Sequence, residues 1–195
     1  YKDKYSYLFM ALGAGLWILI ILVAFLIIVL IGYYNRFTVL SNRIENSLGQ
    51  IDVQLKRRAD LIPNLIETVK GFAKHEKEAI AAVTNARKAL VSATDLPSRL
   101  KADKGLEGAL GRLFAIAEGY PDLKANTNFL ELQRELTSTE DKVAYSRQFY
   151  NDSILDYNNK CKTFPGKVFA GIFGFKEKEY IKITEEERKP VKVKF

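Results

Sequence analysis

The chain has 195 residues, which is enough for one domain of ordinary size with a short accessory segment but too few for two full domains. Its net charge of +7 is dispersed and comes with no signature of nucleic-acid binding, so we expect no nucleic-acid partner. It contains one cysteine, Cys161, and one histidine, His75, which excludes an intrachain disulfide, a cysteine-rich metal site and a multi-histidine metal site.

The first element is an apolar stretch at residues 8–31, which holds no charged residue. As a helix it spans roughly 36 Å, enough to cross a bilayer with some tilt. It is too long for the apolar core of a cleaved secretory signal, and the residues that follow it form a poor cleavage site. Tyrosines flank it at the depths where aromatic rings favour the headgroup layer. We predict a short N-terminal tail at residues 1–7 and a retained single-pass transmembrane helix at 8–31, with the lipid bilayer as a partner.

Membrane orientation follows the Lys and Arg residues near the two ends of such a span. Lys2 and Lys4 before it balance Arg36 and Arg43 after it. The basic run at residues 56–58 tips this balance towards a cytoplasmic main domain.

A long amphipathic helix is expected next, because apolar residues recur at steps of three and four with a coiled-coil-like seam. The stripe comprises Phe37, Leu40, Ile44, Leu48, Ile51, Leu55, Ile62, Leu65, Val69 and Phe72, and later Ile80 and Val83. Pro63 falls inside this pattern, so the chain either kinks there or reverses into a new helix capped by Asp60. The phase continues through Pro63 without slipping, which favours a kinked continuous helix.

The following segment reads as a loop and then a short helix. Residues 92–105 contain Thr94, Asp95, Pro97 and Ser98, which are typical of a loop. A helix is predicted from Leu106 to Glu118, and the turn-forming residues 119–122 end it.

A second long helix follows, with Asn128 and Glu131 as its capping box. Its seam comprises Phe129, Leu132, Leu136, Val143, Tyr150, Ile154, Tyr157 and Cys161, and residues 164–166 stop it. Two long one-sided helices in one chain must cover each other. The predicted fold class is therefore all-α: the transmembrane helix continues into an antiparallel helical bundle at residues 35–175, followed by an irregular tail at 176–195 in which only residues 191–195 alternate like a strand.

The stretch of residues 50–65, QIDVQLKRRADLIPNL, resembles the LemA family of bacterial membrane proteins. Further matching motifs are Thr68-Val69-Lys70-Gly71, Tyr120 to Asn126 with Phe129, Tyr150-Asn151-Asp152, Phe164-Pro165 and Phe173-Gly174-Phe175. The resemblance covers about residues 35–175 and departs at residues 47–49, where relatives more often carry an alanine, an aromatic residue and a serine. It implies a single-pass protein of the bacterial inner membrane with a helical bundle domain and no established activity.

Few residues offer catalytic chemistry. His75 to Glu78 resembles the start of a zinc-protease motif, but Ala79 stands where the second metal ligand is needed. Gly105, Gly108 and Gly111 have neither the spacing nor the preceding strand of a phosphate-binding loop, and such glycines more often permit close helix–helix approach. We therefore expect a protein that is not an enzyme and that holds no metal and no cofactor.

Arg58 stands on the apolar stripe between Leu55 and Ile62. A charge at that position either is paired within the chain or buries its methylene stem with its head in water, or it contacts a partner or a second subunit, unless the phase assigned to the stripe is shifted. Arg58 is therefore a candidate interface residue.

The aromatic segment at residues 164–175 supplies four more candidate interface residues, Phe164, Phe169, Phe173 and Phe175. Aromatic residues beside lysines are typical of a helix at the membrane interface, whereas a helix that covers the open end of the bundle or a subunit contact explains the same pattern. Phe195 is the last candidate, because some partner domains bind an apolar C-terminal residue and its carboxylate, although a disordered tail is the default.

Two functions from different classes fit these features. The first is a membrane-anchored, non-catalytic scaffold that forms a homo-oligomer and binds protein partners at the membrane surface. The alternative is a protein that binds anionic lipids or shapes the membrane, using its basic residues and the aromatic segment.

Overall fold

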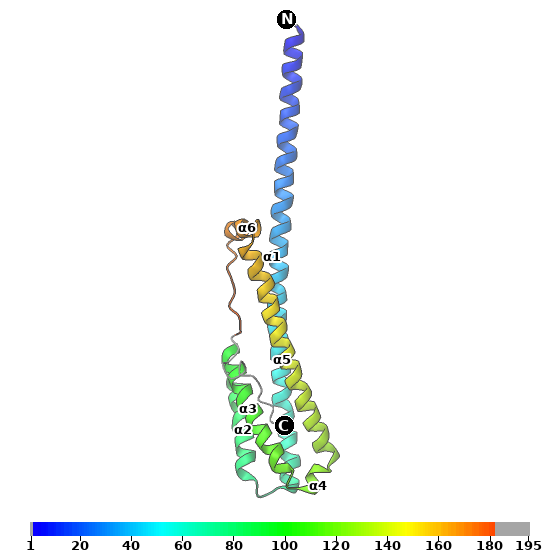
Figure 1. The fold of residues 1–195 in the computed structure, drawn as a ribbon, viewed down its shortest axis with the longest axis vertical. Helices are drawn as coiled ribbons and strands as arrows, with labels where there is room; N and C mark the ends of the chain where they lie inside the picture. Colours follow the sequence, from blue (N-terminus) through cyan, green and yellow to red (C-terminus); the bar gives the residue numbers. More distant parts are fainter. Residues whose placement is uncertain (1, 182–195) are drawn as a thin grey trace, which may run out of the picture. The chain divides into compact units, whose positions relative to one another are not determined.

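The computed structural model describes the backbone of residues 2–181 and the side chains of residues 15–181. Over these residues the chain is all-α, as predicted, and it contains no strand (Figure 1). The helices are α1 (Lys2–Phe72), α2 (Lys77–Ser92), α3 (Leu96–Ala117), α4 (Pro121–Lys124), α5 (Thr127–Lys162) and α6 (Gly166–Phe173). The strand-like alternation at residues 191–195 and the candidate Phe195 lie outside the described residues.

Helix α1 is continuous over 71 residues. Its apolar part reaches a mean hydropathy of 3.2 and is not buried against the rest of the chain, so the helix is long and apolar enough to cross a membrane. Pro63 lies inside it with an exposed ring, between the fully buried Ile62 and Leu65. The predicted continuous helix is thus confirmed, and a helical reversal capped by Asp60 is wrong.

The apolar stripe of α1 ends earlier than the sequence pattern indicated. The helix stops at Phe72, and backbone bonds of Ala73 and Glu76 form a turn before α2. Ile80 and Val83, which continue the three-four spacing, therefore belong to α2. Both helices bury apolar residues in the same core, and the three-four spacing happens to continue across the turn between them.

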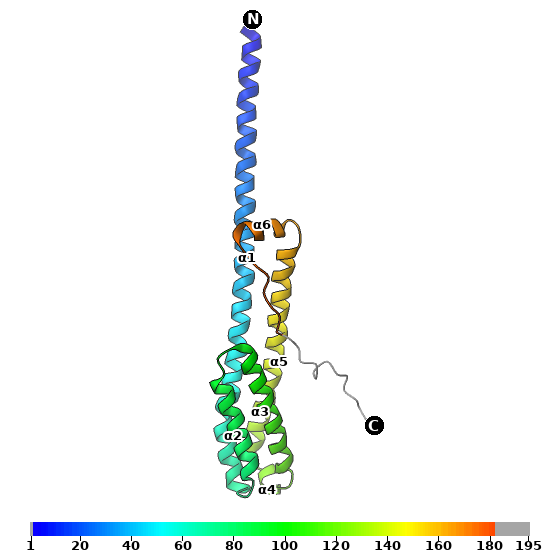
Figure 2. The same cartoon turned by 90° about the vertical axis from the view of Figure 1, so that its left-hand side faces the viewer.

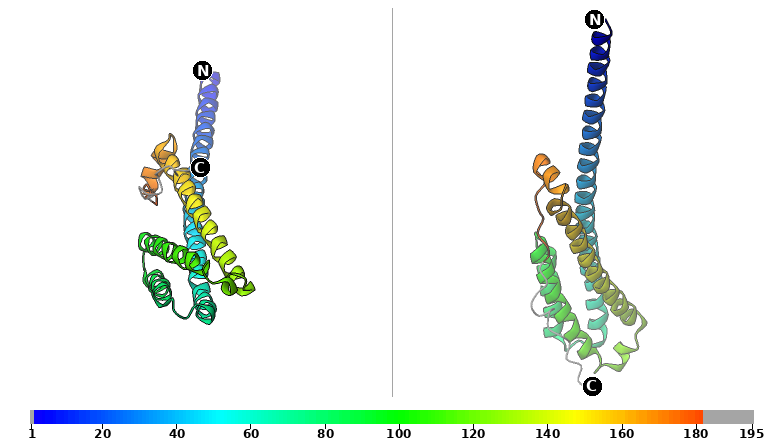
Figure 3. Two further views of the ribbon diagram at one scale, coloured as in Figure 1. Left: turned by 60° about the horizontal axis from the view of Figure 1, so that its bottom comes forward. Right: turned by 45° about the horizontal axis from the view of Figure 1, so that its top comes forward.

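Two compact units divide the chain. Of the described residues, unit 1 comprises 2–44 and 153–179, and unit 2 comprises 45–152, 180 and 181. In unit 1, the end of α5 lies beside α1, and α6 lies across the direction of α1 (Figures 1 and 2). In unit 2, α2 and α3 pack side by side against α1 and α5, which run antiparallel (Figure 3).

Aliphatic side chains from four helices fill the core of unit 2. They include Ile51, Leu55, Ile62, Leu65 and Val69 from α1, Val83 from α2, Leu106, Leu110 and Leu113 from α3, and Leu136 and Val143 from α5. Most residues of the two predicted seams are therefore covered within the chain, whereas Phe72 at the end of the first seam is 42% exposed. Burial of such apolar surface is the main source of stability for a bundle of this kind.

Helix α3 begins ten residues before the predicted start at Leu106, so the expected loop at residues 92–105 is mostly wrong. The Ser98 N–H donates to Asp95 Oδ2 at 3.0 Å, and Pro97 occupies the first turn, where its missing N–H is not needed. The Asp-x-Pro-Ser sequence thus marks a helix start and not a loop.

The N-terminal cap of α5 is Asn126 and not the predicted Asn128. The Phe129 N–H donates to Asn126 Oδ1 at 3.0 Å. Asn128 and Glu131 are instead exposed residues within the first turns of the helix. The helix therefore starts at Thr127, two residues earlier than predicted.

The expected close helix approach at Gly105, Gly108 and Gly111 is also wrong. All three glycines are exposed, and a Cβ atom at any of them meets no other atom within 4 Å.

Candidate functional site

An aromatic cluster in unit 1, here called the aromatic collar, joins α6 to α1 just beyond the apolar stretch. Its members are Tyr33, Tyr34 and Phe37 of α1, Tyr157 of α5, Phe169 and Phe173 of α6, and Phe175. Tyr33 and Phe169 stack with ring centroids 4.3 Å apart, and Phe37 and Phe175 stack at 4.8 Å. Ring pairs at these separations are favourable beyond the area they bury. Three of the candidate interface residues, Phe169, Phe173 and Phe175, are thus brought together here.

Two glycines shape the path of the chain through the collar. A Cβ atom at Gly166 would lie 2.2 Å from the Lys160 carbonyl oxygen, so only glycine fits where α6 starts against the end of α5. Gly174 ends α6 in the left-handed conformation, with φ of 74°, and the Phe175 N–H then donates to the Ala170 carbonyl at 2.9 Å. This reversal returns Phe175 to the collar.

Polar contacts hold the segment after α6 against α5. The buried Asn158 side chain accepts from the Lys178 N–H at 2.9 Å and donates to the Lys178 carbonyl at 2.8 Å, so its amide satisfies both backbone groups. Lys178 Nζ donates to Ser41 Oγ at 2.9 Å and lies 5.4 Å from the Tyr157 ring centroid.

The outer face of α6 differs from the face that forms the collar. Phe169 is only 9% exposed, whereas Phe164, Val168 and Ile172, spaced by four residues, are 85%, 52% and 62% exposed. Helix α6 is therefore apolar on both faces, and within the described residues only one face is covered.

Arg58 in unit 2 is almost completely buried and is paired within the chain. Its Nη1 lies 2.9 Å from Asp103 Oδ1, and its Nη2 lies 3.0 Å from Glu140 Oε2. Asp103 is also buried, while the Glu140 side chain is 47% exposed. The structure thus shows the intrachain ion pair that was one of the interpretations of this residue.

Burial raises the pKa of Asp103 above its ordinary value of 3.8, and the Arg58 guanidinium opposes that rise. Arg58 Nε and Gln54 Oε1 are buried without a hydrogen-bond partner among the described residues. The sequence interpretation did not single out Asp103 or Glu140. A signal for Asp103 was present, because it stands three and seven residues before Leu106 and Leu110 on one face of α3.

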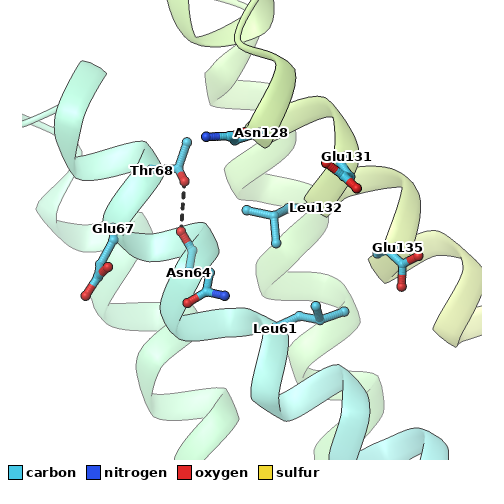
Figure 4. Close-up of a pocket in the computed structure, with 8 residues that line it drawn as sticks. All are labelled: Leu61, Asn64, Glu67, Thr68, Asn128, Glu131, Leu132 and Glu135. Carbon is cyan, nitrogen blue, oxygen red and sulfur yellow. Dashed lines mark hydrogen bonds between the residues drawn. The ribbon is translucent and has the colours of Figure 1, made fainter.

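A groove of about 450 Å³ lies on the surface of unit 2 between α1 and the start of α5 (Figure 4). Its lining residues are Leu61, Asn64, Glu67 and Thr68 from α1, and Asn128, Glu131, Leu132 and Glu135 from α5. Thr68 Oγ1 donates to the Asn64 carbonyl at 2.9 Å, and Glu135 is paired with Arg57 at 2.8 Å. The groove is therefore an open, acidic surface with two leucines in it.

The sequence profile of the LemA family matches residues 47–195. The chain belongs to the LemA family. It is 28% identical over 185 residues to magnetosome protein MamQ of Magnetospirillum gryphiswaldense, covering 82% of this chain and 68% of that protein.

Two other relatives resemble this LemA-family chain to a similar degree. Magnetosome protein MamQ 2 of Paramagnetospirillum magneticum is 27% identical over 173 residues, which is 75% of this chain and 64% of that protein. Protein LemA of Metamycoplasma hominis is 27% identical over 137 residues, which is 70% of this chain and 63% of that protein. The chain thus spans about two thirds of the length of these relatives. Family and apolar helix together identify a membrane-associated protein.

The described part of this LemA-family chain shows little that points to catalysis. Burial raises the pKa of Tyr157 to about 12 and also raises the pKa of the Cys161 thiol, so both groups are protonated at neutral pH and the thiol is a poor nucleophile. Among the described residues, no group of three His, Cys, Asp or Glu side chains is placed to hold a metal ion, and His75 is exposed. The absence of a metal, of a cofactor and of an activity stays a prediction.

Proposed function

We propose that this protein is a membrane-anchored, non-catalytic helical scaffold that self-associates and binds protein partners at the surface of the bacterial inner membrane. The observation that carries this proposal is the contrast between the tightly filled interior of unit 2 and the groove on its surface. Aliphatic side chains and the Arg58 ion pairs fill its interior, whereas its surface carries the open groove of Figure 4. A stable bundle with a recessed surface is suited to binding another protein.

Self-association needs a surface other than the two seams, because most of their residues are buried within the chain. The shared membrane favours self-association. Chains that share a bilayer diffuse in two dimensions, which raises their effective concentration and lets weak contacts form stable assemblies.

Photo-crosslinking in native membranes tests partner binding. A photoreactive side chain at Asn128, which lines the groove, is compared with one at Ala81, which is exposed on α2. The proposal expects discrete cross-linked proteins from position 128 and fewer from position 81. Equal background from both positions would contradict it.

Mass measurement of the intact chain in mild detergent tests self-association, with cross-linking in native membranes as its control. The expected result is a mass above that of one chain. A single-chain mass together with no cross-linked homo-oligomer in membranes would remove this part of the proposal.

The lipid-directed function is the second candidate, and the exposed lysines near α6 favour it. Lys162, Lys167 and Lys176 are exposed around that helix, as expected of a segment that binds anionic headgroups. The test uses the full chain, because deletion of residues 1–34 would remove Tyr33 and Tyr34, the ring partners of Phe169 and Phe173.

The full chain is reconstituted in vesicles that mix anionic and zwitterionic lipids, and the lipids that co-purify with it are measured. This function expects an excess of anionic lipid that falls in high salt and falls further when Lys167 and Lys176 are replaced by Gln. Co-purified lipid with the same ratio of anionic to zwitterionic lipid as the vesicle would argue against this function.

A further inference from the structure

Helix α6 carries an apolar surface that the described chain does not cover. Val168 and Ile172 are four residues apart and so lie along one side of α6, and Phe164 is exposed in the turn just before the helix, while Phe169 and Ala170 face inward and are nearly inaccessible. An exposed apolar surface on a helix whose other side is already packed marks a site of contact with a membrane or another molecule.

The collar fixes where along α1 this surface lies. Phe169 stacks on Tyr33, and Phe173 meets Tyr34 edge-on at 5.2 Å. Tyr33 follows the last residue of the apolar stretch, Ile31, by two positions, which is about 3 Å along a helix axis. If α1 crosses a bilayer through residues 8–31, α6 is therefore held at the depth of the headgroup layer.

The orientation of α6 fits the same layer. Within unit 1 the helix lies across the direction of α1, so it runs along the membrane surface when α1 spans the bilayer (Figures 1 and 2). Cations flank it: Lys160 Nζ lies 4.7 Å from the Tyr33 ring centroid, and the Lys167 side chain is exposed. An apolar face with basic residues beside it is the pattern of a helix that lies in the interface plane.

We propose that α6 is an interfacial helix whose outer face, formed by Val168 and Ile172, lies together with Phe164 of the preceding turn in the boundary between headgroups and acyl chains of the bilayer that α1 crosses. The occupant of this face is lipid and not a second copy of the chain. This inference rests on the proposed anchoring by α1. Unit 1 then contacts the membrane twice, through a span and through a helix on its surface, and stacked aromatic rings join the two.

Tryptophan fluorescence of the full chain in vesicles tests the proposal, because Trp17 in the apolar stretch is the only native tryptophan. Two reporter variants carry Trp17→Phe together with either Ile172→Trp or Leu155→Trp. Leu155 is the matched control, since it is also an exposed apolar residue of unit 1, at 47%, but lies on α5. Each protein is measured with brominated lipids, which quench from within the bilayer, and with acrylamide, which quenches from water.

The proposal expects the reporter at position 172 to emit at shorter wavelength than the one at 155 and to be quenched by brominated lipids, with the reporter at 155 quenched mainly by acrylamide. Three other outcomes overturn it. If 172 behaves like 155, α6 is not in the interface. If 172 resists both quenchers, protein covers the face. If both positions are quenched by lipid, contact with the membrane is not specific to α6.

Native Trp17 separates failure of this inference from failure of the anchoring. Strong lipid quenching of Trp17 with none at position 172 removes the interfacial helix and leaves the anchor. Trp17 open to acrylamide and insensitive to brominated lipid removes the anchor itself.

Discussion

Replacing Arg58 by Met is expected to destabilise unit 2 strongly. The substitution keeps an apolar stem of similar course but removes the guanidinium, so Asp103 is left buried without its cation. Breaking a buried ion pair on one side costs about 3–5 kcal/mol of unfolding free energy, because the remaining charge is not compensated. The second contact, to Glu140, adds little to this figure because that carboxylate is half exposed and screened by water.

The effect of this substitution depends on pH through Asp103. Burial already raises its pKa above 3.8, and without Arg58 the pKa rises further. An acid with a higher pKa in the folded state than in the unfolded state loses folded-state stability as pH rises from the unfolded value through the folded one. The deficit of Arg58→Met is therefore smallest at low pH, where Asp103 is protonated, and it grows as the pH rises through the raised pKa of Asp103.

The assay is urea unfolding of the full chain in mild detergent, followed by far-ultraviolet circular dichroism. A double variant, Arg58→Met with Asp103→Leu, is the control, because replacing a buried pair by apolar side chains is often neutral or stabilising. We expect it to be more stable than Arg58→Met alone. A loss below about 1 kcal/mol in the single variant, or costs that simply add in the double variant, would refute the reasoning.

Three further substitutions test separate features. Asn126→Ala is expected to cost about 1 kcal/mol through loss of the α5 cap, whereas Asn128→Ala leaves the unfolding midpoint nearly unchanged; equal effects would argue against the observed cap. Gly166→Ala is expected to loosen α6 and expose the collar in hydrogen exchange, because its Cβ would clash with a carbonyl, whereas Gly171→Ala, at an open position, should not. His75→Ala is expected to leave any cellular phenotype intact at unchanged protein level, and loss of function would reopen the question of catalysis.

The fold class followed from the period of apolar residues, because a helix that buries one face needs them every three or four positions. The same pattern located the core correctly in both long helices, from Ile51 to Val69 and from Leu136 to Val143. The same pattern also predicted correctly that α1 continues through Pro63. The ring of that residue faces solvent, so only the backbone has to adjust.

Helix ends were predicted less well, because one residue type can serve several purposes. Asp95 and Pro97 are as common in loops as at helix starts, and only the bond from the Ser98 N–H distinguishes the two. Asn126 and Asn128 are both residue types that are preferred as helix N-caps, and the bond from the Phe129 N–H identifies Asn126 as the cap. Such choices depend on tertiary contacts that periodicity does not record.

The ion pairs of Arg58 show a different limit. A charge on an apolar stripe requires compensation, which the sequence makes clear, but its partners come from α3 and α5, 45 and 82 residues further along the chain. Several acidic residues occur on those helices. Only the packing of three helices in unit 2 determines that Asp103 and Glu140 reach the guanidinium.

The aromatic segment shows why composition alone could not decide between membrane contact and capping of the bundle. Phe169 and Phe173 pack on the tyrosines of α1, whereas Phe164 and Ile172 are exposed, so the inner face of α6 is covered by the chain and its outer face is left open to contact with the membrane. Serine substitutions at Phe169 and Phe173 would disturb packing and membrane contact together. If the outer face contacts lipid as proposed, substitutions there alter that contact without disturbing the aromatic collar, and for this reason the reporter at position 172 separates the two interpretations.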